Sequence, residues 1–221
     1  MNMKKISTVI TVSALFLSAL CQAQDWAQFN RYAEQNAQVT TDPKVVFMGD
    51  SITEGWAKED PDFFTGNNFL GRGISGQTTS HMLVRFRRDV IDFSPEYVVI
   101  LAGTNDVARN NGEISLDNVL GNLISMCELA KANRIKPILC AVLPADGFWW
   151  RTEIRPAEDL VRLNSMIKEY ARSAKIPFVD FHTPFKDENG GLPKAYADDG
   201  VHPNLHCYKI MEDIILDYIK Q

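Results

Sequence analysis

The residues of this sequence that could do chemistry lie in short polar groups that follow apolar runs. Gly49-Asp50-Ser51 follows the apolar run 44–48, which is typical of a short buried strand. In open α/β sheets, ligands bind at the ends of such strands. A serine hydroxyl becomes a nucleophile when a neighbouring base takes its proton and donors await the oxyanion. Ser51 is therefore a candidate nucleophile, although a serine in this place could also simply cap a helix.

The candidate base lies near the other end of the chain. Asp199 and His202 are three residues apart, so their side chains share one side at the beginning of a helix. The carboxylate can then accept the imidazole Nδ1–H, which fixes the tautomer and leaves Nε2 for the proton of Ser51. This pattern predicts a Ser-His-Asp arrangement, provided that the two ends of the chain meet.

Two further polar turns could stabilise the charge that forms when a serine attacks an ester. They are Gly73-Ile74-Ser75-Gly76 and Gly103-Thr104-Asn105-Asp106. Gly76 can present a backbone N–H with no side chain in the way, and Asn105 carries an amide NH₂. Because turns after parallel strands lie at one edge of a sheet, we expect these groups to converge. The combination indicates acyl transfer.

The elements that must position these residues alternate along the chain. Apolar runs typical of buried strands occur at 44–48, 69–70, 97–102, 137–143 and 177–181. Stretches with helical spacing occur at 25–39, 78–89, 115–133, 156–174 and 204–219. The segment 56–68 contains Pro61 and Gly66 and is expected to form a loop. The alternation predicts an α/β protein, a three-layer α/β/α domain with a parallel five-stranded sheet.

The beginning of the chain differs from the rest. Lys4 and Lys5 precede the apolar stretch 6–20 and then Cys21-Gln22-Ala23, which is typical of a secretory signal peptide. We expect residues 1–23 to be removed and residues 24–221 to form one domain, exported to the periplasm or the medium. The apolar stretch is short for a membrane span, so no stable membrane insertion is expected after cleavage. Lipid anchoring through Cys21 is the alternative.

Composition limits the other function classes. The 221 residues are 45% hydrophobic and carry a net charge of −5, without the basic cluster that nucleic-acid binding requires. Cys127, Cys140 and Cys207 are an odd number for an exported chain, so at least one is unpaired within the molecule. His202 and His206 could share a helix face, but no His-Glu-x-x-His pattern is present. We therefore expect no metal and no cofactor.

The polar blocks that end at Ser51, Gly76, Asp106 and Pro203 resemble, in this order, the sequence blocks of the SGNH/GDSL hydrolase family. The resemblance extends from about residue 44 to 220 and implies the flavodoxin-like fold of that family. Ile52 replaces a frequent leucine of the signature, a change that affects only packing.

The resemblance also implies a role for each candidate residue. Ser51 would be the nucleophile, His202 its base and Asp199 the group that orients the base. The backbone N–H groups of Ser51 and Gly76 and the side chain of Asn105 would form the oxyanion hole.

The substrate is less well defined by the sequence. Trp149 and Trp150 could stack on a sugar or line an acyl pocket, or one of them could fill the core. Arg109 could meet an acidic group of the substrate or face solvent. The resemblance implies short-chain esters, and export together with the lack of a long aliphatic run in the loop of these tryptophans favours deacetylation of a glycan. The expected partner is thus a small-molecule or glycan ester substrate. A lysophospholipase or thioesterase and a non-catalytic carbohydrate-binding protein are the alternatives.

Overall fold

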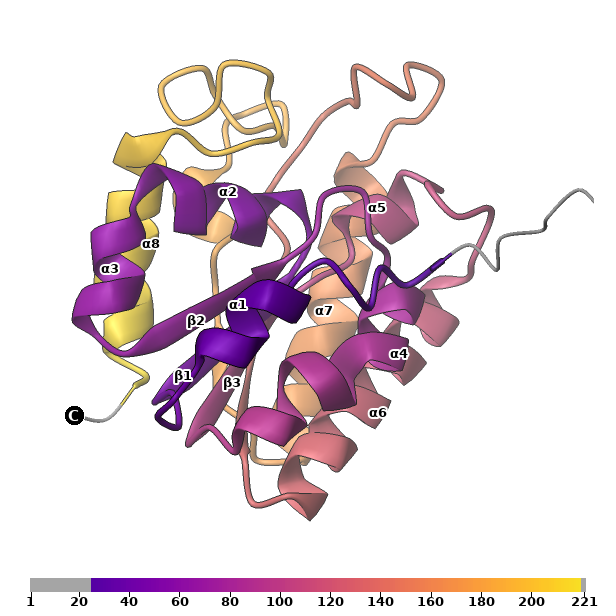
Figure 1. Cartoon of the computed structure of the whole chain (residues 1–221). Coiled ribbons are helices and arrows are strands. Elements are labelled where there is room, and N and C mark those ends of the chain that lie inside the picture. Colours follow the sequence, from indigo (N-terminus) through magenta and orange to yellow (C-terminus); the bar gives the residue numbers. More distant parts are fainter. Residues whose placement is uncertain (1–24, 220–221) are drawn as a thin grey trace, which may run out of the picture.

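Five parallel strands form one sheet in the order β2-β1-β3-β4-β5 (Figure 1). The strands of this computed structural model, which describes residues 25–219, are Val45–Gly49 (β1), Phe69–Gly73 (β2), Tyr97–Leu101 (β3), Lys136–Cys140 (β4) and Phe178–Val179 (β5). The register pairs Gly49 with Gly73 on one side and with Leu101 on the other. The segments that follow β1, β2 and β3 therefore leave the sheet side by side.

Helices cover both faces of the sheet (Figure 1). They are Ala33–Gln38 (α1), Ser51–Glu59 (α2), Pro61–Gly66 (α3), Thr79–Asp89 (α4), Thr104–Val107 (α5), Leu116–Ala132 (α6), Ala157–Ser173 (α7) and Leu205–Leu216 (α8). One face packs against α4, α6 and α7, and the other against α2, α3 and α8. β1 contributes Val46 and Met48 to the first core and Val45 and Phe47 to the second. This double burial explains why its sequence is apolar without alternation.

The prediction of a loop over residues 56–68 is wrong, because this segment continues α2 and then forms α3. Aspartates cap both helices: Asp50 Oδ1 accepts from the Ile52 N–H at 3.0 Å, and Asp60 Oδ1 accepts from the Phe63 N–H at 3.3 Å. Pro61 occupies the first turn of α3, where its missing N–H costs nothing. The caps and this tolerated proline outweigh the loop-forming composition of the segment.

The helix expected over residues 25–39 is shorter in the structure, where only α1 is helical. The Asp25 carboxylate accepts from the N–H groups of Phe29 and Asn30 at 2.8 and 3.0 Å, and residues 26–32 form turns. An aspartate that binds nearby backbone N–H groups competes with helix formation in this way.

Three expectations from the sequence concern the cysteines, the signal peptide and membrane insertion. Cys127, Cys140 and Cys207 are buried free thiols. The expected signal peptide and Cys21 lie outside the described residues. Within residues 25–219, no helix is both long and apolar enough to cross a membrane.

Candidate active site

Ser51 is the first residue of α2 and stands directly after the end of β1. A Cβ atom at Gly49 would lie 2.1 Å from Thr53 Oγ1, and one at Gly73 would lie 2.2 Å from the Glu54 nitrogen. Only glycines therefore allow α2 to begin this close to the ends of β1 and β2. The capping role belongs to Asp50, so the interpretation of Ser51 as a mere cap is wrong.

The structure brings Ser51, His202 and Asp199 together. His202 Nε2 is 2.9 Å from Ser51 Oγ, and His202 Nδ1 is 2.6 Å from Asp199 Oδ2. His202 lies just before α8, whose N-cap Asn204 accepts from the Cys207 N–H at 3.0 Å. In this arrangement, an Nδ1–H donated to the carboxylate leaves Nε2 as the acceptor for the serine proton.

Hydrogen bonds keep the Asp199 carboxylate charged. Burial alone would raise its pKa, but the His202 side chain and the backbone N–H groups of His202 and Val201 donate to it and outweigh that effect. The two backbone N–H groups lie 2.8 and 2.9 Å from Oδ1. The pKa of Asp199 is therefore below its ordinary value, as an orienting carboxylate beside an imidazolium requires.

The two expected oxyanion donors lie beside Ser51. Gly76 is exposed in a left-handed turn with φ +78°, and an added Cβ would meet nothing within 4 Å. The Asn105 amide is buried, donates to the Gln77 carbonyl at 3.0 Å and accepts from Asn110 Nδ2 at 2.6 Å. Because an amide nitrogen carries two N–H groups, the second remains for a ligand.

A cavity of about 280 Å³ connects these groups. It is lined by Ser51, Ser75, Gly76, Asn105, Asn110, Trp149, Trp150 and His202. The Trp150 ring centroid lies 6.2 Å from that of His202, and its Nε1 donates to Asn110 Oδ1 at 2.8 Å. Trp149 is 66% exposed at the edge of the cavity. Both tryptophans thus line the same cavity as Ser51, and their contact with substrate stays a prediction.

The sequence pointed to Arg109 as a substrate-binding residue, but in the structure it is the neighbouring Asn110 that lies at the cavity. Arg109 is not among the lining residues; its guanidinium lies 3.6 Å from the Glu113 carboxylate and is exposed. Asn110 was missed, although it orients Asn105 and lines the cavity. In the sequence, it is only one of several polar residues after Asn105, and nothing in that run singles it out.

Two other carboxylates close to the site are deeply buried. Burial raises the pKa of both Asp50 and Asp106 to about 6. Asp106 accepts from the Thr79 N–H at 2.9 Å and from Thr79 Oγ1 at 2.6 Å, which joins the turn after β3 to the beginning of α4. These carboxylates hold backbone in place and do not contact the cavity.

Residues 47–210 match the profile of the GDSL-like lipase/acylhydrolase family, which is most of the chain. The chain belongs to this family. The crystal structure of a protein from Bacteroides fragilis that is assigned as an acylhydrolase is 50% identical, with a TM-score of 0.86, and the match covers 89% of this chain and 97% of that one. A GDSL-like lipase from Bacteroides thetaiotaomicron is also 50% identical, with a TM-score of 0.85, 88% coverage of this chain and 98% of that one. The sheet flanked by helices is the GDSL hydrolase fold, as expected.

More distant relatives of this chain include an esterase and a lipoprotein. The acetylxylan esterase of Geobacillus stearothermophilus is 25% identical in an alignment that covers 76% of this chain and 90% of that protein. A Bacillus subtilis lipoprotein is 29% identical over 140 residues, or 62% of this chain. The chain spans 56% of that lipoprotein and 44% of another curated relative.

Proposed function

We propose that this chain is an exported serine esterase that removes short acyl groups, above all acetyl, from carbohydrate esters. The observation that carries the proposal is the line of contacts from Asp199 through His202 to Ser51, at 2.6 and 2.9 Å, beside an open cavity. A serine, an imidazole and a carboxylate in this order form the constellation of acyl transfer.

The reaction follows from the positions of these atoms. Ser51 Oγ attacks the ester carbonyl carbon while its proton passes to His202 Nε2. The N–H groups of Ser51 and Gly76 and the Asn105 amide hold the oxyanion. The tetrahedral intermediate then expels the alcohol, which takes the proton from His202. Water, activated by the same imidazole, releases the acyl group from Ser51 as a carboxylic acid.

The cavity supports a short acyl group and a sugar. Of its lining residues, only the two tryptophans are large and apolar, and none is aliphatic. A long acyl chain would gain little from such a lining, because apolar contact is what binds it. The exposed face of Trp149 offers a surface for a sugar ring. The acetylxylan esterase relative agrees with this substrate class, and the signal-like beginning and the lipoprotein relative agree with export.

The chemistry can be tested by removing the nucleophile. Ser51→Ala should lower the turnover of nitrophenyl acetate by several orders of magnitude, because the triad members act as a unit. His202→Ala should have a similar effect. A Ser51→Ala protein whose turnover is close to that of the parent would exclude Ser51 from the mechanism.

The substrate needs a separate experiment. The parent should hydrolyse nitrophenyl acetate faster than longer esters and should release acetate from acetylated xylan. Maximal activity on acyl chains of about eight carbons or more would favour a lysophospholipase or thioesterase instead. Binding to xylan without any ester turnover would favour a non-catalytic carbohydrate-binding protein.

A further inference from the structure

The loop between β2 and α4 carries the Gly76 N–H, and its shape depends on a few buried contacts. Within it, the Gln77 N–H donates to the Ile74 carbonyl at 3.2 Å, which closes the turn around Gly76. The Ile74 N–H donates to the Gly49 carbonyl, also at 3.2 Å. The Ser75 N–H donates to the buried Glu54 carboxylate at 2.8 Å. The loop is exposed at Ser75 and Gly76, so the groups behind it must fix its position.

Gln77 is the buried residue that joins this loop to the rest of the molecule. Its side chain accepts from Arg85 Nε at 2.6 Å and donates to the Ala27 carbonyl at 2.9 Å. Because a guanidinium only donates and a carbonyl only accepts, these partners fix which way the amide lies. The backbone carbonyl of Gln77 accepts from Asn105 Nδ2 at 3.0 Å. Gln77 therefore contacts one proposed oxyanion donor, Asn105, and is the neighbour in sequence of another, Gly76.

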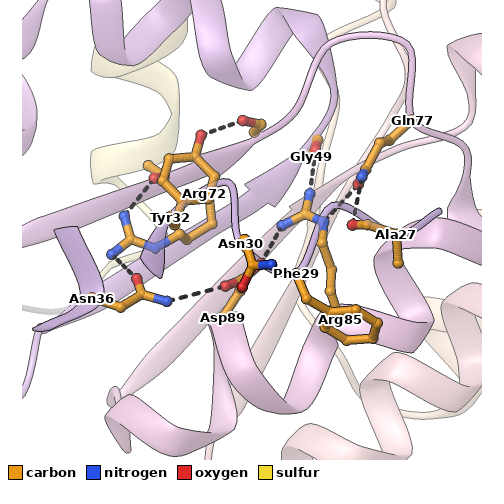
Figure 2. Close-up of polar contacts among 12 residues, drawn as sticks. Ala27, Phe29, Asn30, Tyr32, Asn36, Gly49, Arg72, Gln77, Arg85 and Asp89 are labelled. Atoms are coloured by element: carbon orange, nitrogen blue, oxygen red, sulfur yellow. Dashed lines mark hydrogen bonds and ion pairs between the residues drawn. The ribbon is translucent and has the colours of Figure 1, made fainter. Parts of the chain in front are cut away.

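Arg85 connects the same loop to the strand that precedes Ser51. Its guanidinium is fully buried, donates to the Gly49 carbonyl at 3.0 Å and pairs with Asp89 at 2.9 Å (Figure 2). One side chain thus contacts both the end of β1 and Gln77. A charged group this deeply buried is stable only when its partners stay in place, so it holds them firmly.

The first described residues complete this arrangement. Residues 25–38, which we call the N-terminal strap, lie behind the loop, and none of them lines the cavity. Besides the Ala27 carbonyl, the strap provides the Tyr32 hydroxyl, which donates to the Gly73 carbonyl, and Arg31, which pairs with Glu54 (Figure 2 shows the Ala27 and Tyr32 contacts). Hydrogen bonds from Ser75, Lys58 and Arg31 outweigh burial and lower the pKa of Glu54 to about 2. The strap therefore contacts the loop directly and through Glu54.

We propose that Gln77 is a positioning residue for the oxyanion hole and that the N-terminal strap acts on catalysis through its contacts with Gln77 and Gly73. The inference rests on the proposed function, since it needs Gly76 and Asn105 to hold the oxyanion. Gln77 does not touch the substrate. It sets where the Gly76 N–H and the Asn105 amide lie, and a displacement of about 1 Å can cost about 100-fold in rate.

Two variants test the proposal by kinetics. Gln77→Met keeps the length of the side chain but removes both side-chain hydrogen bonds, and should lower kcat about 10- to 100-fold with KM changed by less than about threefold. Tyr32→Phe removes one hydroxyl of the strap, and should lower kcat several-fold in the same manner. The readout is whether the loss of activity on nitrophenyl acetate lies in kcat or in KM. Both are measured at a temperature where circular dichroism shows each variant folded.

Asn164→Leu is the matched control, because Asn164 is also a buried amide that bonds backbone, at Val142, away from the loop. It should lower the melting temperature and leave kcat near that of the parent. A folded Gln77→Met protein with the parent's kcat would overturn the proposal. If Gln77→Met does not fold, an unchanged kcat for Tyr32→Phe would overturn it. An inactive parent would instead overturn the proposed function itself.

Discussion

Carboxylates in and beside the candidate site differ in pKa according to which groups donate to them. Asp50 is fully buried with one N–H donor at 3.0 Å, and burial raises its pKa to about 6. At Asp199, burial acts in the same direction, but three donors outweigh it and the pKa falls below its ordinary value. The spacing of Asp199 and His202 was enough to predict their contact. The contacts of Gln77 and Asn110 were not predictable, because they depend on how distant loops pack.

At the level of single residues, Asn105 offers a direct test of the oxyanion hole. Asn105→Ala should reduce kcat about 100- to 1,000-fold, because it removes one donor to the developing charge. Asn67→Ala is a suitable control, since Asn67 is exposed at the end of α3, before β2 begins at the opposite edge of the sheet. Steady-state hydrolysis of nitrophenyl acetate measures both. Equal kcat for the two variants would remove Asn105 from the hole.

Asp50 should also make stability depend on pH. Its pKa is about 6 in the folded chain, above the value of 3.8 expected when unfolded, so the folded state holds this proton more tightly. Its contribution is therefore favourable below about pH 4 and is lost as the pH rises through about 6. Asp50→Asn keeps a capping oxygen without the charge.

Urea unfolding across this range tests the Asp50 prediction. The gain in unfolding free energy of Asp50→Asn over the parent should grow between about pH 4 and 6 by at most about 3 kcal/mol, the equivalent of about two pKa units. Above that range the gain should be constant. A gain that does not change with pH would show that Asp50 is not protonated in this way.

At the level of elements, the strands and long helices were predictable, and the region after Ser51 was not. β1, β3 and β4 are apolar on both faces, a pattern that polar loops do not produce. α2 and α3 are short, and Pro61, Gly66 and the asparagines just after α3 favoured a loop, so only the aspartate caps marked the two helices. Trp56, the first residue of the segment that the sequence predicted to be a loop, is fully buried where α2 packs against α8.

Trp56 should dominate the stability of this contact. Its ring stacks on those of Phe63 and Tyr208, each with a centroid separation of 5.6 Å, and Nε1 donates to Glu212 at 3.0 Å. Trp56→Ala should lower the free energy of unfolding by about 3–5 kcal/mol. Trp149→Ala, at an exposed position, should change it by less than about 0.5 kcal/mol. Urea denaturation measures both; a small loss for Trp56→Ala would contradict the packing described.

At the level of the whole molecule, the sheet order explains how residues far apart in sequence meet. Because β1 lies between β2 and β3 and all run parallel, the segments after them leave at one edge, and α8 begins there too (Figure 1). The alternation of strands and helices predicted this edge. It did not predict the hydrogen bonds of the N-terminal strap, because the helical spacing at 25–39 indicated only a helix and not its contacts with the loop before α4.

The reactivity of the cysteines should report on unfolding of the whole domain. Cys127, Cys140 and Cys207 are buried, and burial raises the pKa of Cys127 and Cys207 to about 12. The thiolate is the reactive form, so these thiols should react with Ellman's reagent only after urea unfolds the chain. Rapid reaction of any of the three in the native protein would contradict the core as described.

The central claim is that Ser51, activated by His202, is the nucleophile of this GDSL hydrolase. The most direct measurement is labelling with a fluorophosphonate, followed by peptide mass spectrometry of the modified residue. The account predicts an adduct on Ser51 in the parent, slower labelling of His202→Ala and none of Ser51→Ala. An adduct on another residue, or equal labelling of Ser51→Ala, would contradict it.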